Sequence, residues 1–378
     1  MKKLLRWIAV FAIVAMVAAA CGDDEPEGQP TGDETGEPTE ETTEPAEPTQ
    51  VGLVYDIGGR GDLSFNDAAA AGLDRATSDF NLEVEELEPN QGGTNREELL
   101  RLLAEQEFDL IIGVGFLFAE TICSAALDFP DVNFGDIDGF ISGEPLDEGE
   151  VPTCEGAQDL TEDSNVASLL FAEHEGSFLV GAAAALKSTT GTIGFIGGVE
   201  IPLIQKFQAG YEAGARQINP DIQIEVAYLT QPPDFTGFND PAKGKETAAG
   251  MFDAGADVVY HAAGGSGAGL FEAAREASEA AGEQRWAIGV DSDQYMSAPA
   301  EVQPYILTSM LKRVDVAVYE SIEAQVNDEF VGGYHTFDLE RDGVGYATSG
   351  GFIDDIADQL EELKQQIIDG EIEVPDAL

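Results

Sequence analysis

The sequence predicts an α/β protein built as two lobes, each around a mostly parallel sheet. From Val51 onward, short apolar runs of the kind found in buried strands alternate with stretches whose apolar residues recur on one helical face. This alternation continues over more than three hundred residues, which is typical of parallel sheets covered by helices on both faces. The strand candidates are too many for one small sheet, so two Rossmann-like lobes are the economical arrangement.

Each predicted element is a run that fits one of these two patterns. The predicted strands are Val51–Tyr55, Leu82–Leu87, Leu110–Val114, Val132–Asp136, Thr192–Ile196, Ile222–Tyr228, Val258–His261, Trp286–Val290 and Tyr305–Thr308. The predicted helices are Ser64–Ser78, Arg96–Glu105, Ala119–Leu127, Asn165–Leu186, Ile201–Ile218, Pro241–Ala254, Gly269–Ala281, Val314–Asp328 and Asp354–Asp369. Open α/β sheets bind ligands beyond the carboxyl ends of their strands, so we expect a ligand cleft where these ends of the two lobes face each other.

The composition excludes polyanionic partners. The 378 residues include 73 Asp and Glu against 18 Lys and Arg, a formal net charge of -55. Such a chain repels nucleic acid and anionic membrane surfaces. Eleven of the acidic residues lie between Cys21 and Gln50, whereas 62 belong to the rest of the chain. The acidity is therefore mainly that of the body, and it favours a neutral or cationic ligand.

The first twenty residues have the pattern of a signal peptide. Basic residues up to Arg6 precede the apolar stretch Trp7–Ala20, which is shorter than the roughly 20 residues of a membrane-spanning helix. Small residues then lead directly to Cys21, as in a bacterial lipobox, so we expect Cys21 to be lipidated and to become the mature N-terminus. The alternative is a chance cysteine after an ordinary cleavage site. Residues 21–50 are acidic and lack aromatic residues, which predicts a disordered tether.

The remaining cysteines, Cys123 and Cys154, form an even pair in a chain expected to be exported. A disulfide between them is plausible in an oxidising compartment, and two unpaired buried thiols are the alternative. The histidines are scattered singly along the sequence with no cysteine at zinc-ligand spacing. We therefore expect neither a metal site nor a cofactor.

Polar and glycine-rich segments follow several predicted strands. A loop from Asp56 to Asp67 contains three glycines and ends in a Phe-Asn-Asp sequence. Asp138 follows the fourth strand, and Asp291 follows a later one, where a carboxylate can accept two hydroxyl hydrogen bonds from a sugar. The run Gly264–Gly269 lies between a strand and a helix and exposes backbone donors. As a dinucleotide fingerprint this run is weak, because its glycine spacing does not fit.

Five ordered blocks of sequence resemble the basic membrane protein family, the lipoprotein substrate-binding subunits of ABC importers that include purine nucleoside receptors. The blocks are Gly58–Asp67, Phe207–Gly214, Phe238–Lys245, Gly289–Gln294 and Thr308–Arg313. The resemblance implies a type I periplasmic-binding-protein fold, a clamshell that closes on a nucleoside, most simply a purine, and delivers it to a permease and its ATPase. It also implies a monomer held outside the cytoplasm, on the cell membrane, by its lipid alone.

The resemblance assigns roles to individual residues. Phe65 matches the first-lobe aromatic that stacks on the base, and Phe238 looks like its counterpart in the second lobe. Asn66 matches a polar ligand contact. Asp291 matches the aspartate that accepts from ribose hydroxyls, and Lys312, expected at the start of a helix after the hinge, matches a ligand-contacting lysine.

Further residues are similar in placement to ligand contacts. Asp56 and Asp138 correspond to residues that read the base or the ribose. The backbone of His261 and of Gly264 to Gly267, Gly265 included, is expected to line the pocket.

The expected division of the chain follows from these assignments. Residues 1–20 form the signal peptide and 21–50 the tether. Residues 51–164 with about 310–330 form lobe 1, and residues 165–309 with about 331–378 form lobe 2. Two other functions remain open from the sequence: a nucleoside-sensing receptor, and a nucleoside-cleaving enzyme that uses Asp138 and Asp291 as paired carboxylates.

Overall fold

The computed structural model describes residues 47–90, 92–142 and 159–378. Residues 47–378 form one compact unit. The expected signal peptide, Cys21 and most of the tether lie outside the described residues, as does Cys154. Cys123 is buried and disulfide-bonded, but its pairing with Cys154 stays a prediction.

The first sheet is six-stranded and entirely parallel, with the order β11-β5-β4-β3-β1-β2. Its strands are β1 (Thr49–Val54), β2 (Leu82–Leu87), β3 (Leu110–Val114), β4 (Asn133–Ile137), β5 (Val166–Phe171) and β11 (Gly333–Phe337). The helices that accompany it are α1 (Phe65–Asp79), α2 (Arg96–Glu105), α3 (Ala119–Asp128) and α9 (Val314–Val326). Helices α1 and α9 pack against each other, and α2 packs against α3.

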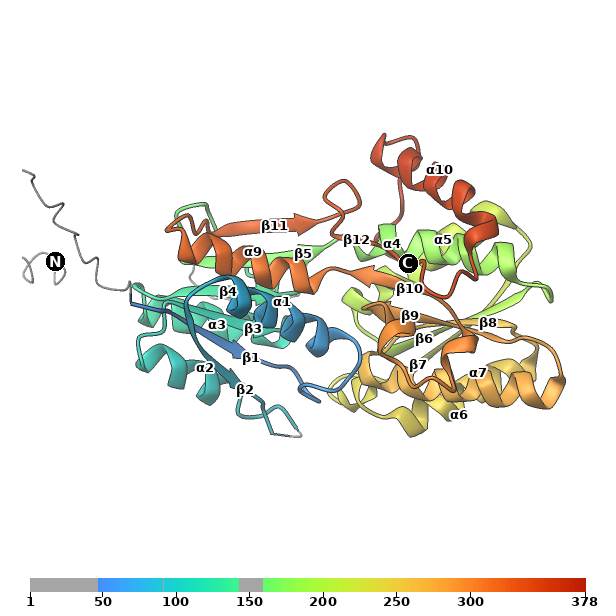
Figure 1. Cartoon of the computed structure of the whole chain (residues 1–378), viewed down its shortest axis with the longest axis horizontal. Coiled ribbons are helices and arrows are strands. Elements are labelled where there is room, and N and C mark those ends of the chain that lie inside the picture. The colour runs from blue at the N-terminus through green and yellow to red at the C-terminus, as the bar shows by residue number, and fades with distance from the viewer. Residues whose placement is uncertain (1–46, 91, 143–158) are drawn as a thin grey trace, which may run out of the picture. The chain divides into compact units, whose positions relative to one another are not determined.

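The second sheet has the order β12-β10-β9-β8-β6-β7, and only β12 runs antiparallel to its neighbour. Its strands are β6 (Thr192–Val199), β7 (Gln223–Thr230), β8 (Val258–Ala262), β9 (Trp286–Asp291), β10 (Ile306–Lys312) and β12 (Val344–Tyr346). The helices of this lobe are α4 (Glu173–Lys187), α5 (Pro202–Ile218), α6 (Pro241–Ala254), α7 (Gly267–Ala281), the short α8 (Gln294–Ser297) and α10 (Ala357–Ile368). Figure 1 shows α6 and α7 side by side along one side of this sheet, with α4 and α5 on the other.

The two sheets repeat one plan, since β1 to β5 occupy the same positions in the first sheet as β6 to β10 in the second. The chain passes from one lobe to the other three times. A single residue, Ala172, separates β5 from α4, and Arg313 alone separates β10 from α9. The third crossing joins β11 to β12. These short connections place the lobes side by side and leave the carboxyl ends of their strands facing a common cleft.

The two-lobed α/β prediction is confirmed, and two details of it are corrected. The segment predicted as one helix, Asn165–Leu186, contains strand β5 followed at once by α4. Strand β5 is almost wholly buried, so its apolar run carries no period that separates it from the helix. Strands β5 and β11 both pair in the first sheet, although the expected division gave residues 165–309 and 331–378 to lobe 2.

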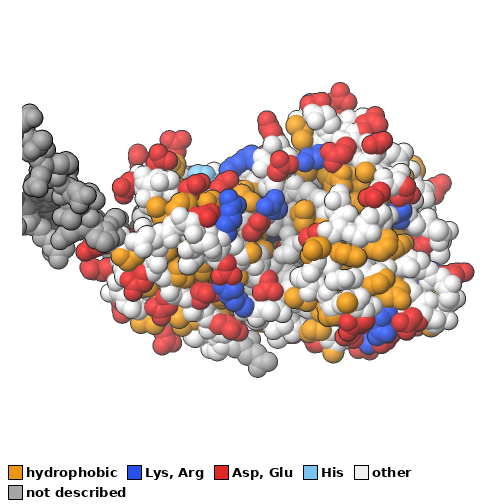
Figure 2. Space-filling view, viewed as in Figure 1, with side chains coloured by type: hydrophobic (Ala, Val, Ile, Leu, Met, Phe, Trp, Pro, Cys, Tyr) orange, Lys and Arg blue, Asp and Glu red, His pale blue; other side chains and the backbone are white. Residues whose placement is uncertain are grey.

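The apolar residues form one large core cluster that spans both lobes and two smaller ones. The smaller clusters lie beneath α2 and α3 in the first lobe and beneath α6 and α7 in the second. Acidic side chains are spread over the face of the molecule visible in Figure 2, with few Lys and Arg between them. Among the described residues, none of the helices has both the length and the apolar character that a bilayer crossing requires.

Candidate ligand-binding site

A cavity lies between the carboxyl ends of the two sheets and encloses about 590 Å³ of space, part of it open to solvent. Its lining comes from both lobes and consists of Asp56, Ile57, Asp62, Phe65, Asn66, Gly115, Phe116, Asp138, Leu203, Ile204, Phe207, Phe238, Ala262, Ala263, Gly264, Val290, Asp291 and Lys312. The strand-end position expected from the sequence is therefore where the cavity is found.

Of the nine residues proposed from sequence as ligand contacts, the structure brings eight to this wall. Those eight are Asp56, Phe65, Asn66, Asp138, Phe238, Gly264, Asp291 and Lys312. Gly265 is not among the lining residues, because it faces the side chains of Asn239 and Asp62 instead. His261 is also displaced from the wall, and it lies fully buried beneath Ala262 and Ala263, which line the cavity in its place.

The loop between β1 and α1 is held in shape by its own carboxylates. Asp62 accepts hydrogen bonds from the backbone N–H groups of Ser64 (2.9 Å), Asn66 (2.9 Å) and Asp67 (3.1 Å). It thereby satisfies donors that the first turn of a helix leaves without partners. Asp67 in turn accepts from the N–H groups of Gly61 and Leu63. The loop therefore presents Phe65 and Asn66 to the cavity from a fixed backbone.

Lys312 is the most deeply buried cation at the cavity. It is the last residue of β10, rather than the first of the following helix, and its side chain is 2% exposed. Its Nζ lies 2.6 Å from Asp138 Oδ2 and 3.1 Å from Glu173 Oε1. Burial opposes its charge, but the surrounding carboxylates outweigh this and raise the pKa of Lys312 above its usual value. Lys312 therefore remains a cation that holds both lobes together at their crossings.

Aromatic rings surround the same ammonium group. The rings of Phe65, Phe171 and Phe207 have their centroids 5.1, 5.0 and 5.5 Å from Lys312 Nζ. The face of an aromatic ring attracts a cation within about 6 Å. These rings keep water from the ion pairs and fix the direction of the Lys312 side chain.

Lys206 of α5 supports the neighbouring carboxylate from the other side. Its Nζ lies 2.9 Å from Glu173 Oε2 and donates to the carbonyl oxygen of Phe171 at 2.7 Å. Burial raises the pKa of Glu173, yet Lys312 and Lys206 together lower it below its ordinary value. Glu173 therefore stays ionised, and its charge is compensated by two cations.

Asp138 and Asp291 occupy matching positions, at the ends of β4 and β9. Both have left-handed backbones, with φ of 68° and 64°, which is unusual for residues other than glycine. Burial raises the pKa of Asp138 to about 6, although Lys312 opposes the shift. Burial raises the pKa of Asp291 to about 7, opposed by Lys312 and by the hydroxyl of Ser64, which donates to Asp291 Oδ2 at 2.6 Å. Both carboxylates can thus change charge near neutral pH.

Asp56, in the loop after β1, is paired with Arg96. Arg96 Nη2 lies 2.5 Å from Asp56 Oδ1, and these side chains are 11% and 15% exposed. The backbone N–H of Ile57 also donates to Oδ1. Asn66 Oδ1 accepts from the N–H of Asp56, so the buried amide that was expected to contact ligand also positions this carboxylate.

Sequence reasoning missed several residues of the site. Asp62 and Phe207 lie within the blocks quoted above but were assigned no role, whereas Phe116 lies outside them. Phe116 meets Phe235 of the second lobe with ring centroids 6.0 Å apart. The available signal was an aromatic residue two positions after β3, at a strand end like those of the other site residues. Glu173 and Lys206 carried no local signal, since they reach the site only through the crossings of the chain.

The cavity suits a small polar ligand with a flat apolar portion. Aromatic rings enter from both lobes, and carboxylates at its ends can accept hydrogen bonds from hydroxyl or N–H donors. Within the described ranges, no group of three or more His, Cys, Asp or Glu side chains is arranged to hold a metal ion. Two lobes joined by short crossings around such a cavity are the arrangement expected of a solute-binding protein.

Comparison with known proteins places the chain in a family. Residues 49–377 match the family model of PnrA-like ABC transporter substrate-binding proteins, and the chain belongs to this family. A solved solute-binding protein of an ABC transporter system from Aeropyrum pernix K1 is similar, with a TM-score of 0.71 and 31% identity over 87% of this chain and 94% of that one. The family resemblance and the periplasmic-binding fold expected from the sequence are thereby confirmed.

Curated relatives extend the similarity. The ABC transporter nucleoside-binding protein BmpA of Lactococcus lactis is 32% identical over 85% of this chain and 88% of its own length. A lipoprotein of Pyrococcus abyssi is 34% identical over 80% of this chain and 69% of its own length. The protein described here is thus a substrate-binding protein of the ABC transporter class, with a relative named for nucleoside binding.

Proposed function

We propose that this protein captures an unphosphorylated nucleoside, with a purine base, between its lobes and delivers it to the permease and ATPase of an ABC importer. The observation that carries the proposal is that Phe65 of the first lobe and Phe238 of the second lobe both line the cavity. Offset stacking on an aromatic ring contributes about 0.5 to 1.5 kcal/mol per ring beyond area burial. Because the two rings belong to different lobes, base binding and lobe closure are coupled.

The polar groups divide the proposed ligand into two ends. Asp291 and Lys312 lie at the hinge side and suit ribose hydroxyl groups. Asp138, which is paired with Lys312, lies with this group, and Asp56 and Asn66 supply acceptors for the N–H edge of the base. The fixed loop of Asp62 and the short crossings leave these groups few alternative positions, which favours a preorganised site.

The charges of the side chains that line the cavity favour a ligand without a phosphate group. Asp56, Asp62, Asp138 and Asp291 line the cavity together with the single lysine Lys312, and the ammonium group of Lys312 is already paired with Asp138 and Glu173. A phosphate would enter a negative site with no free cation among the described lining residues. Neutral nucleosides avoid this repulsion.

The proposed location is outside the cytoplasm, with the monomer attached to the membrane through lipid on Cys21. The lipobox pattern of the sequence and the lipoprotein name of the Pyrococcus relative support this. The proposed role is binding without turnover, and no residue is assigned a catalytic part. A sensing receptor and a nucleoside-cleaving enzyme are the alternative functions that the test below distinguishes.

Calorimetric titration of the full chain tests the proposal. We expect binding of guanosine, inosine or adenosine in preference to cytidine and uridine, and no binding of guanosine monophosphate, ribose or leucine. Phe65→Ala and Phe238→Ala should each weaken binding by about tenfold, whereas Phe140→Ala, an aromatic outside the cavity lining, should leave it unchanged.

Three results would count against parts of this proposal. Binding of a sugar or an amino acid in place of every nucleoside would overturn the ligand class. Release of free base during incubation would show an enzyme. Uptake that is unaffected when the protein is deleted from a cell that imports the nucleoside would favour the sensing role.

A further inference from the structure

Three side chains, Ser64, Ser292 and Gln294, donate hydrogen bonds from one lobe to the other beside the cavity, and none of them belongs to its lining. The Ser64 hydroxyl donates to Asp291 Oδ2 at 2.6 Å. The Ser292 hydroxyl donates to the carbonyl oxygen of Ser64 at 3.1 Å. The Gln294 amide donates through Nε2 to the carbonyl oxygen of Leu63 at 2.9 Å. We call these three contacts the latch.

On the second lobe, Gln294 is oriented by its own neighbours. The side chain is 1% exposed, and its Oε1 lies 2.8 Å from the backbone nitrogen of Val290, which donates to it, and 3.0 Å from His261 Nε2. Its backbone N–H donates to the hydroxyl of Ser309. Burial lowers the pKa of His261 to about 4, so the ring is neutral. Because Gln294 Oε1 is an acceptor, as its bond from Val290 shows, the His261 Nε2 that faces it carries the proton. With Oε1 engaged from within the lobe, Nε2 has to point toward Leu63.

On the first lobe, the acceptors of the latch are equally fixed. Leu63 has a left-handed backbone with φ of 57°, a conformation that a branched apolar residue rarely adopts. Asp67 holds the N–H of Leu63 at 2.9 Å, and Asp62 holds the N–H of Ser64 at the same distance. These bonds turn the carbonyl oxygens of Leu63 and Ser64 toward the second lobe. The strained backbone is thus maintained at the point where the lobes meet.

We propose that Ser64 and Gln294 are positioning residues, which set how long the lobes stay closed on a ligand without contacting that ligand. Ser64 lies next to Phe65, and Gln294 lies beyond Asp291, so the latch adjoins two residues of the proposed ligand site. This inference rests on the proposed function for the ligand, but the latch itself is a contact between lobes. Ser64 and Gln294 contact no ligand group, and Asp291, the one latch residue in the cavity wall, faces the ribose that all nucleosides share. Loss of the latch should therefore affect every bound nucleoside to the same degree.

The test combines two substitutions with two readouts. Ser64→Ala removes one donor of the latch. Gln294→Glu keeps an oxygen for Val290 and His261 but removes the amide donor to Leu63, so its own lobe retains its packing. For guanosine, inosine and adenosine, each variant should raise the dissociation rate about threefold to tenfold, the range of one net hydrogen bond, and leave the association rate and the order of preference unchanged.

Matched controls separate the latch from general effects of losing a polar side chain. Gln303→Ala removes an amide whose hydrogen bond among the described residues stays within its own lobe, to the carbonyl oxygen of Ala298. Ser321→Ala removes a buried hydroxyl that bonds only within α9. Both control variants should dissociate nucleosides at the wild-type rate.

Hydrogen exchange of the ligand-free full chain gives a readout that needs no ligand. Gln294→Glu should speed exchange in the peptide covering residues 57–67, which belongs to the opposite lobe. Unchanged exchange there, or dissociation rates equal to the wild type, would overturn the latch. Failure of wild-type protein to bind any nucleoside would overturn the proposed function instead, while the exchange measurement would still decide the latch.

Discussion

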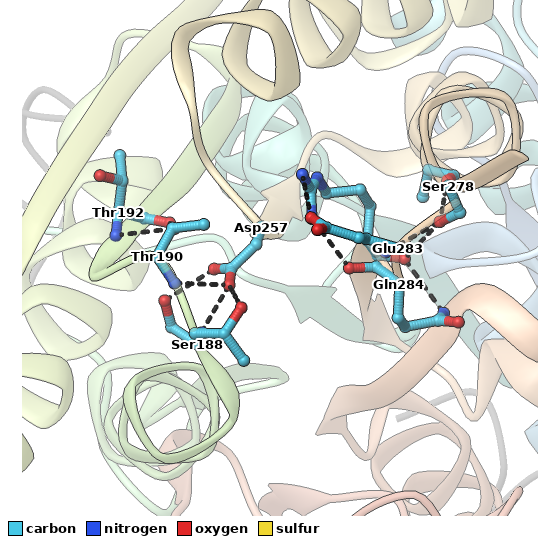
Figure 3. A network of polar contacts seen from close by, with 10 residues as sticks. Ser188, Thr190, Thr192, Asp257, Ser278, Glu283 and Gln284 are labelled. Atoms are coloured by element: carbon cyan, nitrogen blue, oxygen red, sulfur yellow. Dashed lines mark hydrogen bonds and ion pairs between the residues drawn. The ribbon is translucent and has the colours of Figure 1, made fainter. Parts of the chain in front are cut away.

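Two buried aspartates at opposite ends of the second sheet show how differently one residue type is used. Asp257 precedes β8 at the amino end, where it accepts from the hydroxyls of Ser188 (2.6 Å) and Thr189 (2.8 Å) and from the N–H groups of Thr189 and Thr190. Figure 3 shows this network, with Asp257 facing Ser188 and Thr190 from across the turn before β6. Asp291 is the last residue of β9, at the carboxyl end of the sheet, and its carboxylate accepts a hydrogen bond from Ser64 of the other lobe.

The two aspartates differ in where the hydrogen-bond donors to their carboxylates come from. Asp257 is saturated by a neighbouring turn of its own lobe, so its hydrogen bonds stabilise the sheet regardless of the cleft. Asp291 depends on the opposite lobe and retains acceptor capacity toward the cavity. A buried carboxylate with such spare capacity carries a desolvation cost, which is consistent with its raised pKa and with its place at the ligand site.

Removing the saturated carboxylate should have the largest effect on folding. Asp257→Ala deprives four donors of their acceptor, and we expect the free energy of unfolding to fall by about 2 kcal/mol. Chemical denaturation measures this. Nucleoside affinity should be unchanged at temperatures where the variant is folded, and a loss of affinity would contradict the separation of the two ends.

Removing the carboxylate in the cleft should weaken ligand binding and leave the free energy of unfolding nearly unchanged. Asp291→Ala is expected to weaken nucleoside binding by more than tenfold, because two ribose hydroxyl groups lose their charged acceptor. The free energy of unfolding should change by less than about 1 kcal/mol, since the substitution also removes a costly buried charge. Calorimetry and denaturation on the same sample test both halves, and unchanged affinity would remove Asp291 from the site.

The pH dependence of binding sharpens the comparison. Burial raises the pKa of Asp291 to about 7, and the ionised form is the stronger acceptor, so affinity should increase about tenfold from pH 5.5 to 7.5. The same shift makes folding stability change in the other direction: the contribution of a raised carboxyl pKa is fully present below about pH 4 and is lost as the pH rises through 7.

Asp291→Asn should flatten the binding profile around pH 7. A smaller dependence near pH 6 should remain, because burial raises the pKa of the adjacent Asp138 to about 6. A wild-type affinity that is constant over this range would show that neither carboxylate titrates in contact with ligand.

A third buried aspartate extends the series with the smallest expected effect. Asp136 in β4 is fully buried, and neither of its carboxylate oxygens has a hydrogen-bond partner among the described residues. Burial raises its pKa well above the usual value. Asp136→Asn removes the charge, so its stability relative to wild type should increase with pH and reach about 1 kcal/mol at pH 8. Equal stability of both proteins at every pH would show that Asp136 carries no charge-dependent cost.

Much of the fold followed from local pattern. The period of the apolar residues predicted nearly every strand from β1 to β10 and the helices between them, because a strand buried on both faces reads as a short apolar run. The exception was β5, where Val166–Phe171 is followed after one residue by α4. The polar residues Glu173 to Glu175 already belong to α4, and no proline or turn sequence precedes them. The apolar run and the helix therefore read as one element, and the membership of β5 and β11 in the first sheet could not be inferred.

The site residues that directly follow a strand could be predicted from the sequence. Those that are brought together by the crossings between the lobes could not. Asp56, Asp138 and Asp291 each follow a predicted strand, and the family resemblance drew attention to Phe65 and Phe238. Glu173 meets Lys312, and Lys206 in turn meets Glu173, only because the crossings of the chain bring distant segments together. No spacing in the sequence brings residues 138, 173, 206 and 312 together.

The sequence by itself determined the alternating elements, the acidic surface, the glycine-containing loop after β1 and the position of chemistry at strand ends, because these depend on residues close together in the chain. Only the tertiary structure decided which carboxylates are shared between lobes. Burial between distant segments produces the pKa values of Asp138 and Asp291. It also produces the ion pairs of Lys312 and the contact of Gln294 with Leu63. Burial of that kind depends on how two folded lobes meet, and the order of residues along one strand does not encode it.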